Sequence, residues 1–200
     1  MTDKKLPQSF YISNNILDIS KILLGKVLVT KLNGKKTTGI IIEVEAYLGV
    51  KDKASHSYNN KRTKRTEPMY LKGGIGYIYL CYGIHYMLNV VVGEINTPYA
   101  ILIRSVEPLS GEKTMLKRRN LNKITESLTN GPGKLTQAFG ITSTLNYEPL
   151  ISDKIWIEDR GINVKEKNIL SSKRIGVDYA GEDAKLPYRF YIKNNKWVSK

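Results

Sequence analysis

The chain has 200 residues, of which 41% are hydrophobic, enough for one continuous core and one domain over residues 1–200. Its 32 Lys and Arg against 18 Asp and Glu leave a net charge of +14, which indicates a polyanionic partner. The single cysteine and two histidines exclude an internal disulfide and a standard zinc site. We therefore expect a reducing compartment, no metal and, because no apolar run approaches the length that spans a bilayer, no membrane insertion.

The charge does not by itself identify the polyanion. Ribosomal proteins, proteins that bind anionic membranes and enzymes of nucleic acids share this composition. A solvated basic face without a specific partner also stays open. The composition therefore defines a class of partner only.

The first predicted element is a helix between Ser13 and Gly25. Its apolar residues follow helical spacing, Ser13 or Asn14 is placed to cap its start, and Gly25 is placed to end it. Short runs of β type follow, separated by turns that contain glycine or asparagine. These runs are 26–32, 38–46, 76–82, 86–92 and 99–106. Short connections between consecutive strands indicate a largely antiparallel sheet.

Two further helices are predicted in the second half of the chain. One covers about 110–120, and the other begins in the segment 130–135, where a proline suits the first helical position and free amide groups bind anions. The segment 154–197 has the pattern of strands and turns. The core residues that this pattern predicts are Ile155, Trp156, Ile157, Phe190, Tyr191, Ile192 and Trp197. No linker or repeat divides the chain, so one domain is expected.

Tyrosines are concentrated in one part of the sequence. They are Tyr70, Tyr77, Tyr79, Tyr82 and Tyr86. Aromatic rings beside basic charge commonly hold an unstacked base, and Tyr82 at the end of a hairpin arm can act as a wedge. The alternative is that these rings pack on the sheet with their hydroxyls in water.

A pair of glutamates, Glu43 and Glu45, lies on one face of an otherwise hydrophobic strand. Burial raises a carboxyl pKa and a nearby cation lowers it, and this balance lets a glutamate serve as a general base. Arg104, which ends another apolar strand, is the candidate cation. The alternative is an ion pair with a structural role only.

Several blocks together identify a family resemblance. They are Glu45-Ala46-Tyr47-Leu48-Gly49, Ala54-Ser55-His56-Ser57, the segment 77–83, Asn89, the segment 104–109 and the segment 130–135. In this order and approximate spacing, from about Leu23 to Trp197, the chain closely resembles the alkyladenine (3-methyladenine) DNA glycosylases. The resemblance implies an α/β mixed (α+β) fold: a single domain around a curved antiparallel β-sheet with flanking helices, like the C-terminal domain of formyltransferases.

The activity implied by the resemblance is that of a monofunctional DNA glycosylase of base excision repair. Such an enzyme flips alkylated or deaminated purines (3-methyladenine, 7-methylguanine, hypoxanthine, ethenoadenine) from duplex DNA and hydrolyses the N-glycosidic bond, leaving an abasic site. No lysine matches a nucleophile position, and no cofactor is implied. The implied partner is double-stranded DNA with a damaged purine, bound by a monomer. The implied place is the bacterial cytoplasm, associated with the nucleoid, or the nucleus in a eukaryote.

The resemblance also assigns roles to residues. Glu45 would activate the water, Arg104 would hold it, and Tyr82 would enter the minor groove in place of the flipped base. The base pocket would be formed by Tyr47, His56, Tyr79 and Asn89, with Asn89 rejecting normal guanine through its exocyclic amine. The side chains expected to meet phosphates are Arg62, Lys64, Arg65 and Lys134.

One loop departs from the family pattern, because Lys64 and Thr66 stand where proline and asparagine are usual. From charge and tyrosines alone, a noncatalytic RNA- or ribosome-binding protein stays open, and fold analogy suggests transfer-RNA binding. Glu45 discriminates between these hypotheses, since a partly buried carboxylate repels phosphates but is required for hydrolysis.

Overall fold

The computed structural model describes residues 4–199. Their nine strands form one antiparallel sheet with the order β1-β7-β2-β3-β6-β5-β4, and a β8–β9 hairpin joins it through β9 and β3. The strands are β1 Lys4–Lys5, β2 Val27–Leu32, β3 Lys35–Tyr47, β4 Gly76–Cys81, β5 His85–Val92, β6 Tyr99–Ser110, β7 Ile155–Asp159, β8 Ile169–Ser172 and β9 Arg189–Ile192. The predicted antiparallel sheet is therefore confirmed.

The described residues form three α-helices and several short 3-10 helices. The α-helices are α1 Ile16–Leu23, α2 Glu112–Arg119 and α3 Pro132–Phe139. The 3-10 helices are η1 Gln8–Tyr11, η2 Gly49–Lys51, η3 Tyr58–Asn60, η4 Glu67–Tyr70, η5 Glu126–Leu128, η6 Ser143–Leu145, η7 Glu166–Asn168 and η8 Asp178–Lys185. Within residues 4–199 no helix combines the length and apolar character needed to cross a membrane.

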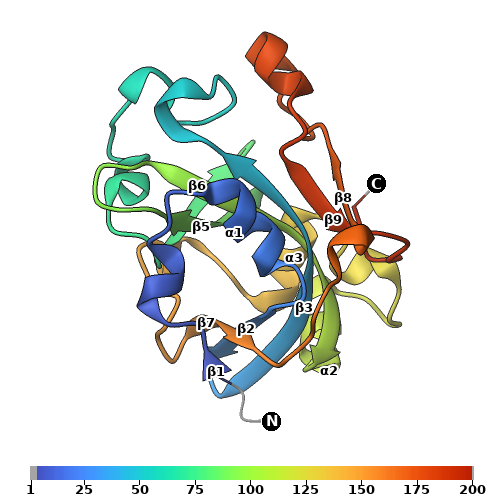
Figure 1. Cartoon of the computed structure of the whole chain (residues 1–200). Helices are drawn as coiled ribbons and strands as arrows, with labels where there is room; N and C mark the ends of the chain where they lie inside the picture. Colours follow the sequence, from blue (N-terminus) through green and yellow to red (C-terminus); the bar gives the residue numbers. More distant parts are fainter. Residues whose placement is uncertain (1–3, 200) are drawn as a thin grey trace.

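The long strand β3 organises the molecule. It runs through nearly the full height of Figure 1 and curves, so that the sheet wraps around a core. α1 packs against β3 and β6, and α3 packs against β5 and β6. Val44, Ile101 and Ile103 in the centre of the sheet are completely buried. The curvature leaves the end of β3 near Tyr47 free to border a cavity.

Some predicted boundaries were wrong for identifiable reasons. Asn15, rather than Ser13 or Asn14, caps α1, because its side chain accepts a hydrogen bond of 3.3 Å from the Asp18 amide. β6 continues to Ser110, where a helix was predicted, because the chain turns only at Gly111. That glycine has φ +85° and lies against the Lys36 carbonyl, a position that a side chain cannot take.

The C-terminal part of the predicted core is confirmed in part. Ile155 and Ile157 are fully buried, and Trp156, Phe190 and Trp197 are nearly so. Tyr191 and Ile192 are only partly buried, because the short strand β9 is followed in the sheet only by the four-residue edge strand β8.

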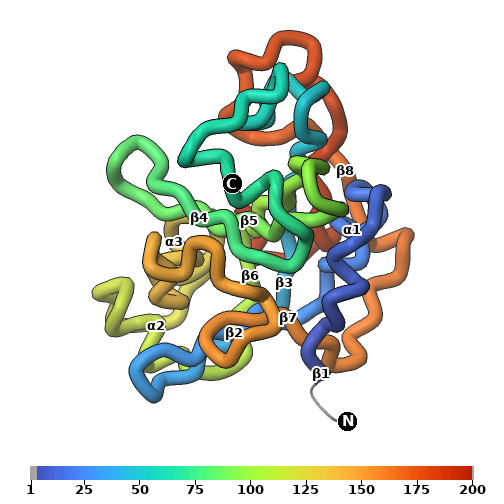
Figure 2. The backbone as a smooth tube through the Cα atoms, turned by 90° about the vertical axis from the view of Figure 1, so that its left-hand side faces the viewer, coloured from blue at the N-terminus to red at the C-terminus, as the bar shows by residue number. Residues whose placement is uncertain are grey.

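Two segments far apart in the sequence meet above the sheet. Figures 1 and 2 both place the segment after β3, residues 49–66, beside the segment 174–188. The Lys53 amide donates to Asp183 at 2.8 Å, and the Tyr179 hydroxyl donates to the Ala54 carbonyl at 3.1 Å. These two segments form the walls of the cavity described below.

Candidate active site

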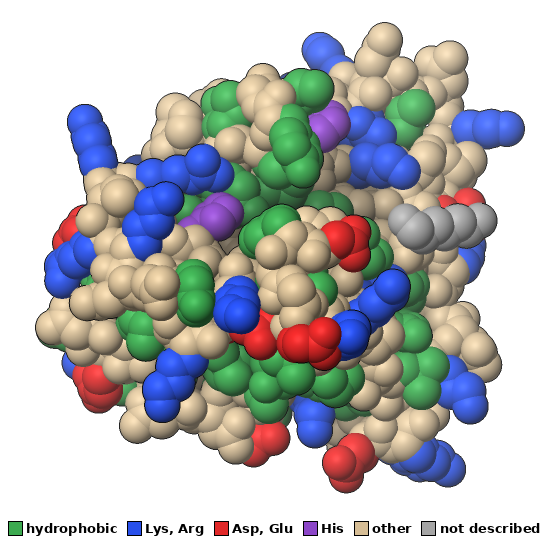
Figure 3. Space-filling view, turned by 90° about the horizontal axis from the view of Figure 1, so that it is seen from above, with side chains coloured by type: hydrophobic (Ala, Val, Ile, Leu, Met, Phe, Trp, Pro, Cys, Tyr) green, Lys and Arg blue, Asp and Glu red, His purple; other side chains and the backbone are tan. Residues whose placement is uncertain are grey.

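A cavity of about 880 Å³ opens between these walls and strands β4, β5 and β6. This is within the usual size of a pocket for a small organic group. Strand residues of its floor include Met87, Asn89, Ala100, Leu102 and Arg104. The face seen from above carries many Lys and Arg side chains beside hydrophobic ones (Figure 3). The cavity therefore combines an apolar interior with basic surroundings.

Strand pairing explains why the predicted site residues meet there. Glu45 in β3 pairs with Leu102 in β6, Leu102 pairs with Asn89 in β5, and Asn89 pairs with Tyr77 in β4. Directly opposed residues of antiparallel strands point to the same face of a sheet. Glu45, Asn89 and Tyr77 thus form one row across the sheet, although more than forty positions separate Glu45 from Asn89 in the sequence.

Glu45 lies directly beneath the cavity and is completely buried. Its Oε1 accepts the Ile175 amide hydrogen at 2.8 Å and is 3.2 Å from Nη1 of Arg104. Its Oε2 accepts a hydrogen bond of 2.8 Å from the Tyr47 hydroxyl. All three donors come from residues that line the cavity. Glu45 therefore has the charged partner that the sequence predicted. It also has two uncharged donors, the Ile175 amide and the Tyr47 hydroxyl, that the sequence did not reveal.

Arg104 is placed by irregularities of the sheet. Glu43 pairs with Ser105 and Val44 pairs with Ile103, so Arg104 is an extra residue of β6 at a bulge. Such bulges re-aim a side chain. Arg104 is 7% exposed, lines the cavity, and reaches Glu43 as well as Glu45. The strand alternation alone would not have pointed its guanidinium between two carboxylates.

The walls of the cavity are aromatic. The rings of His56 and Tyr79 meet edge to face at 4.7 Å, and the rings of Tyr77 and Tyr79 are 5.3 Å apart. Nδ1 of His56 is hydrogen-bonded to the Tyr77 hydroxyl at 2.8 Å. Tyr47 lines the cavity from the end of β3. A planar group that enters between these rings would be in contact with aromatic faces.

Burial controls the charge of these groups. It lowers the pKa of His56 to about 4, with the nearby charges of Arg65 and Lys61 acting in the same direction. Burial also raises the pKa of Tyr77 to about 12 and raises that of Tyr79. The pKa of Tyr47 is raised by burial and then by the charge of Glu45. Near neutral pH these four aromatic side chains are therefore uncharged.

The β4–β5 hairpin presents Tyr82 to solvent. β4 ends at Cys81, one residue earlier than predicted, because Tyr82 has φ +50° and begins the turn. Its side chain is 92% exposed, and its neighbour Ile84 is 72% exposed. Tyr82 also lines the mouth of the cavity. A large exposed ring on a hairpin tip at a pocket mouth agrees with the predicted wedge position.

Asn89 is almost fully buried and lines the floor. Its side-chain amide donates to the Tyr77 carbonyl at 3.1 Å, which holds the amide group in place. The structure thus brings together Glu45, Arg104 and all the predicted pocket residues.

The predicted phosphate contacts lie in different surroundings. Arg62 is engaged by Glu67, with Nε to Oε2 at 2.8 Å, and its guanidinium stacks over Tyr70. Arg65 lines the cavity with its guanidinium 4.8 Å from the ring of Tyr79. Lys64 is exposed, and Lys134 donates to Asn130 at 2.9 Å. Arg62, Lys64 and Arg65 are all exposed, and their contact with phosphates stays a prediction.

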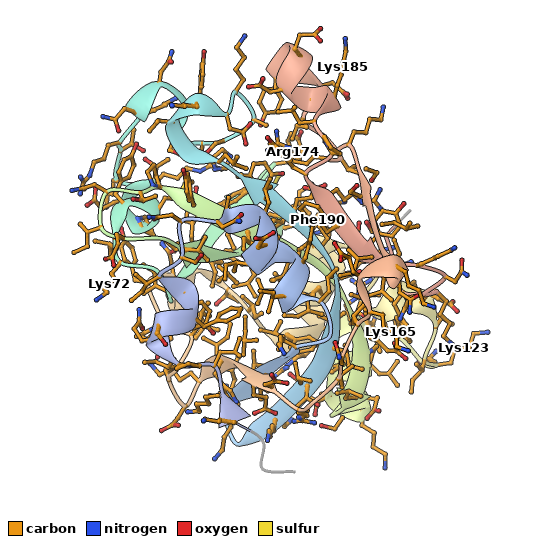
Figure 4. The ribbon with its side chains drawn as sticks, viewed as in Figure 1. Lys72, Lys123, Lys165, Arg174, Lys185 and Phe190 are labelled. Carbon is orange, nitrogen blue, oxygen red and sulfur yellow. The ribbon has the colours of Figure 1, made fainter. Side chains whose placement is uncertain are left out.

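Sequence reasoning missed Arg174, which stands behind the pocket where the C-terminal segment meets the top of β3 (Figure 4). Its guanidinium is fully buried, pairs with both oxygens of Asp52 at 2.5 and 2.9 Å, and lies 4.8 Å from the Tyr47 ring. In Figure 4 Lys72 and Lys185 point outward from the surface of the molecule instead. A charged residue in a glycine-containing loop gave no periodic signal that could have identified this contact.

The arrangement defines a class of protein. A buried carboxylate beside an arginine, below an aromatic pocket on a basic surface, is suited to hydrolysis at a base that has been taken out of a nucleic-acid stack. The exposed tyrosine at the pocket mouth fits the same class, because enzymes of this kind fill the vacated position.

Comparison with known proteins agrees with this class. The family model described as Methylpurine-DNA glycosylase (MPG) matches residues 9–196. A protein of Chlamydia felis is 48% identical over 192 residues, 96% of this chain and 97% of the relative. A protein of Natranaerobius thermophilus is 45% identical over 98% of both chains, and one of Clostridium novyi is 44% identical over 98% of this chain and 99% of its own. All three bear the name "Putative 3-methyladenine DNA glycosylase".

The chain therefore belongs to the methylpurine-DNA glycosylase family. It is a DNA glycosylase, a hydrolase of N-glycosyl bonds that acts in the repair of alkylation damage, and its substrate is DNA. The family resemblance and the fold expected from it are confirmed. The noncatalytic RNA-binding and transfer-RNA-binding alternatives are set aside.

Proposed function

We propose that the protein is a monofunctional glycosylase that removes alkylated or deaminated purines from duplex DNA as a monomer. The observation that carries the proposal is Glu45, a completely buried carboxylate held by Arg104, the Ile175 amide and the Tyr47 hydroxyl directly below an aromatic cavity. The name of the relatives supports 3-methyladenine as one substrate. The aromatic walls support other electron-poor purines such as 7-methylguanine, hypoxanthine and ethenoadenine.

In the proposed reaction the damaged base stacks among Tyr47, His56 and Tyr79. The bond from the anomeric carbon to the base nitrogen breaks, and its electron pair leaves with the base. Glu45 removes a proton from a water whose oxygen bonds to the anomeric carbon, which yields an abasic site. General-base assistance of this kind supplies about a hundred- to ten-thousandfold in rate.

One rearrangement is required by this mechanism. The Tyr47 hydroxyl donates a hydrogen bond to Oε2 of Glu45, and the Glu45 side chain is not exposed to solvent, so a water cannot reach this oxygen. We propose that the Tyr47 ring moves onto the flipped base and frees Oε2 for the water. Arg104 keeps its contact with Oε1 and orients the carboxylate and the water.

Recognition of the lesion is proposed to involve two further residues. Tyr82 enters the minor groove and offsets part of the few kcal/mol that unstacking costs. Asn89, held on the pocket floor by the Tyr77 carbonyl, rejects the exocyclic amine of a normal guanine. Arg65, which lines the cavity, and its exposed neighbour Lys64 contact phosphates of the DNA.

The monofunctional assignment rests on the positions of the lysines. Lys53 and Lys61 line the cavity, but both are exposed, whereas Glu45 is buried behind it and is held by three residues that line it. An amine that attacks the anomeric carbon would lead to strand cleavage after base release. We expect intact abasic DNA until it is treated with alkali.

The test is single-turnover release of free base from a duplex that carries one hypoxanthine or ethenoadenine, in chelator, with the intact protein and Glu45→Gln. Glu158→Gln is the matched control, because Glu158 is also buried but lies in β7 and does not line the cavity. We expect Glu45→Gln to lose at least about a hundredfold in rate and to retain lesion binding.

Two outcomes would contradict the proposal. Release by Glu45→Gln at the rate of the intact protein would show that Glu45 is not the base. Loss of both release and lesion binding, with Glu158→Gln unaffected, would mean that Glu45 has a structural role only.

A further inference from the structure

The second glutamate of β3, Glu43, is as deeply buried as Glu45, but of the described residues that contact it only Arg104 lines the cavity. Its Oε1 accepts from Nε of Arg104 at 3.1 Å, from Nε of Arg189 at 2.6 Å and from the Ser199 hydroxyl at 2.8 Å. Its Oε2 accepts from the Ser199 amide at 2.6 Å and from the Ser105 hydroxyl at 3.1 Å. Donors from three separate segments therefore fix this carboxylate.

Arg104 divides its donors between the two glutamates. Nε contacts Glu43, and Nη1 contacts Glu45 at 3.2 Å. A guanidinium is planar and rigid, so a contact at Nε determines the direction in which Nη1 points. The side chain of Arg104 stands on a bulge, where the backbone alone does not impose the usual strand direction. Glu43 supplies a constraint, together with the Ser199 hydroxyl that it holds and that accepts from Nη2 of Arg104 at 3.3 Å.

The charges support the same assignment. Glu43 and Glu45 form two buried negative charges, and Arg104 and Arg189 are the guanidinium groups that contact them. Arg189 contacts Glu43 and donates to the Ser199 carbonyl at 3.0 Å. Arg104 is the one that links Glu43 to the site. Because Arg189 also pairs with the charge of Glu43, Arg104 remains able to contact Glu45 beside the cavity.

From this geometry we infer that Glu43 is a positioning residue of the reaction. It acts through Arg104, whose guanidinium it holds in the orientation that orders Glu45 and the attacking water. Glu43 touches neither DNA nor the reacting atoms. The inference rests on the proposed function, since it gives Glu43 importance only if Glu45 and Arg104 serve in hydrolysis.

The expected signature is a slower chemical step with unchanged binding. Glu43→Gln keeps the size and part of the acceptor capacity of the side chain but removes its charge. We expect the single-turnover rate at saturating enzyme to fall by about ten- to a hundredfold, because small displacements of a positioned group have effects of this size. The enzyme concentration that gives half the maximal rate should stay within about threefold of that of the intact protein.

A double-mutant cycle with Arg104→Lys separates positioning from a merely structural role. A lysine has one compact ammonium and cannot contact Glu43 and Glu45 in the way a guanidinium does. If Glu43 acts through Arg104, adding Glu43→Gln to Arg104→Lys should slow the reaction by less than about threefold. Glu158→Gln, a buried glutamate in β7 that accepts from Trp156 at 2.7 Å, is the matched control and should keep the rate of the intact protein.

The inference is overturned if Glu43→Gln has the rate of the intact protein, or if it slows the Arg104→Lys background as much as the intact background. If melting curves show that Glu43→Gln does not fold, Glu43→Asp takes its place in the same cycle, because it retains the charge at a shorter reach. Failure of the proposed function is recognised separately, since then Glu45→Gln would release base as fast as the intact protein. In that case the double-mutant cycle does not measure a step that depends on Glu45, and the inference about Glu43 is rejected together with the proposed function.

Discussion

His56 makes a testable contribution to the pH dependence of stability. Burial first, and then the charges of Arg65 and Lys61, lower its pKa from 6.5 to about 4 in the folded protein. In the unfolded chain its pKa returns to about 6.5. Between these two values the unfolded state binds a proton that the folded state does not, so folding is disfavoured as the pH falls.

The size of the effect follows from the two pKa values. One pKa unit corresponds to about 1.4 kcal/mol, so the full shift from 6.5 to about 4 amounts to about 3 kcal/mol. Between pH 7 and pH 5 the part expressed is about 2 kcal/mol, since the folded ring begins to titrate only near pH 4. Carboxyl groups contribute little in this interval, because most of them titrate below pH 5.

The assay is urea unfolding of the intact protein and of His56→Gln at pH 7, 6 and 5. The substitution should lower stability at every pH, because it removes the contacts with Tyr77 and Tyr79. The free energy of unfolding should also fall less between pH 7 and pH 5 than in the intact protein, by about 2 kcal/mol. An identical pH slope for His56→Gln and the intact protein would refute the reasoning.

Two other substitutions test the support of the pocket and its mouth. Arg174→Met leaves the buried carboxylate of Asp52 without its charged partner, which should lower the free energy of unfolding by about 3–5 kcal/mol and the melting temperature by roughly 10 °C. Calorimetry measures the melting temperature, and a change of less than about 2 °C would contradict this prediction. Tyr82→Ala should weaken binding to a lesion duplex by about tenfold or more, because the flipped state loses its wedge. In fluorescence anisotropy, equal losses on damaged and undamaged duplex would contradict the wedge role.

The strand pattern predicted most of the sheet because alternation and turns are local features. From alternation alone, Glu43 and Glu45 were expected on one face, and both are indeed buried together. The choice of Arg104 as the cation was also confirmed by the contact with Glu45. The bulges that aim Arg104 were not predictable, since they depend on the register of β3 against β6 and leave no mark in the hydrophobic pattern.

The contacts that support the pocket from behind could not be predicted for a related reason. Asp52 and Arg174 are 122 positions apart, and each lies in an irregular segment. Neither periodicity nor capping signals apply to such positions. Arg62 shows another contact that the sequence pattern did not reveal, because Glu67, five positions further on, pairs with this side chain.

The C-terminal segments complete the active site. The geometry of the site therefore depends on folding of the whole chain. Ile175 donates to Glu45 across 130 positions, Arg174 pairs with Asp52 across 122, and Ser199 donates to Glu43 across 156. Contacts of such separation form only after the intervening chain has folded, because the entropy of closing the loop opposes them until then. The contacts of Glu43 and Glu45 with the C-terminal segments should thus form late, when these segments dock, whereas the contacts with Arg104 depend only on the pairing of β3 with β6. A loss of docking at residues 174–186, which lie between β8 and β9, would leave the sheet intact and remove the Ile175 amide from Glu45, so hydrolysis should be lost before the fold is.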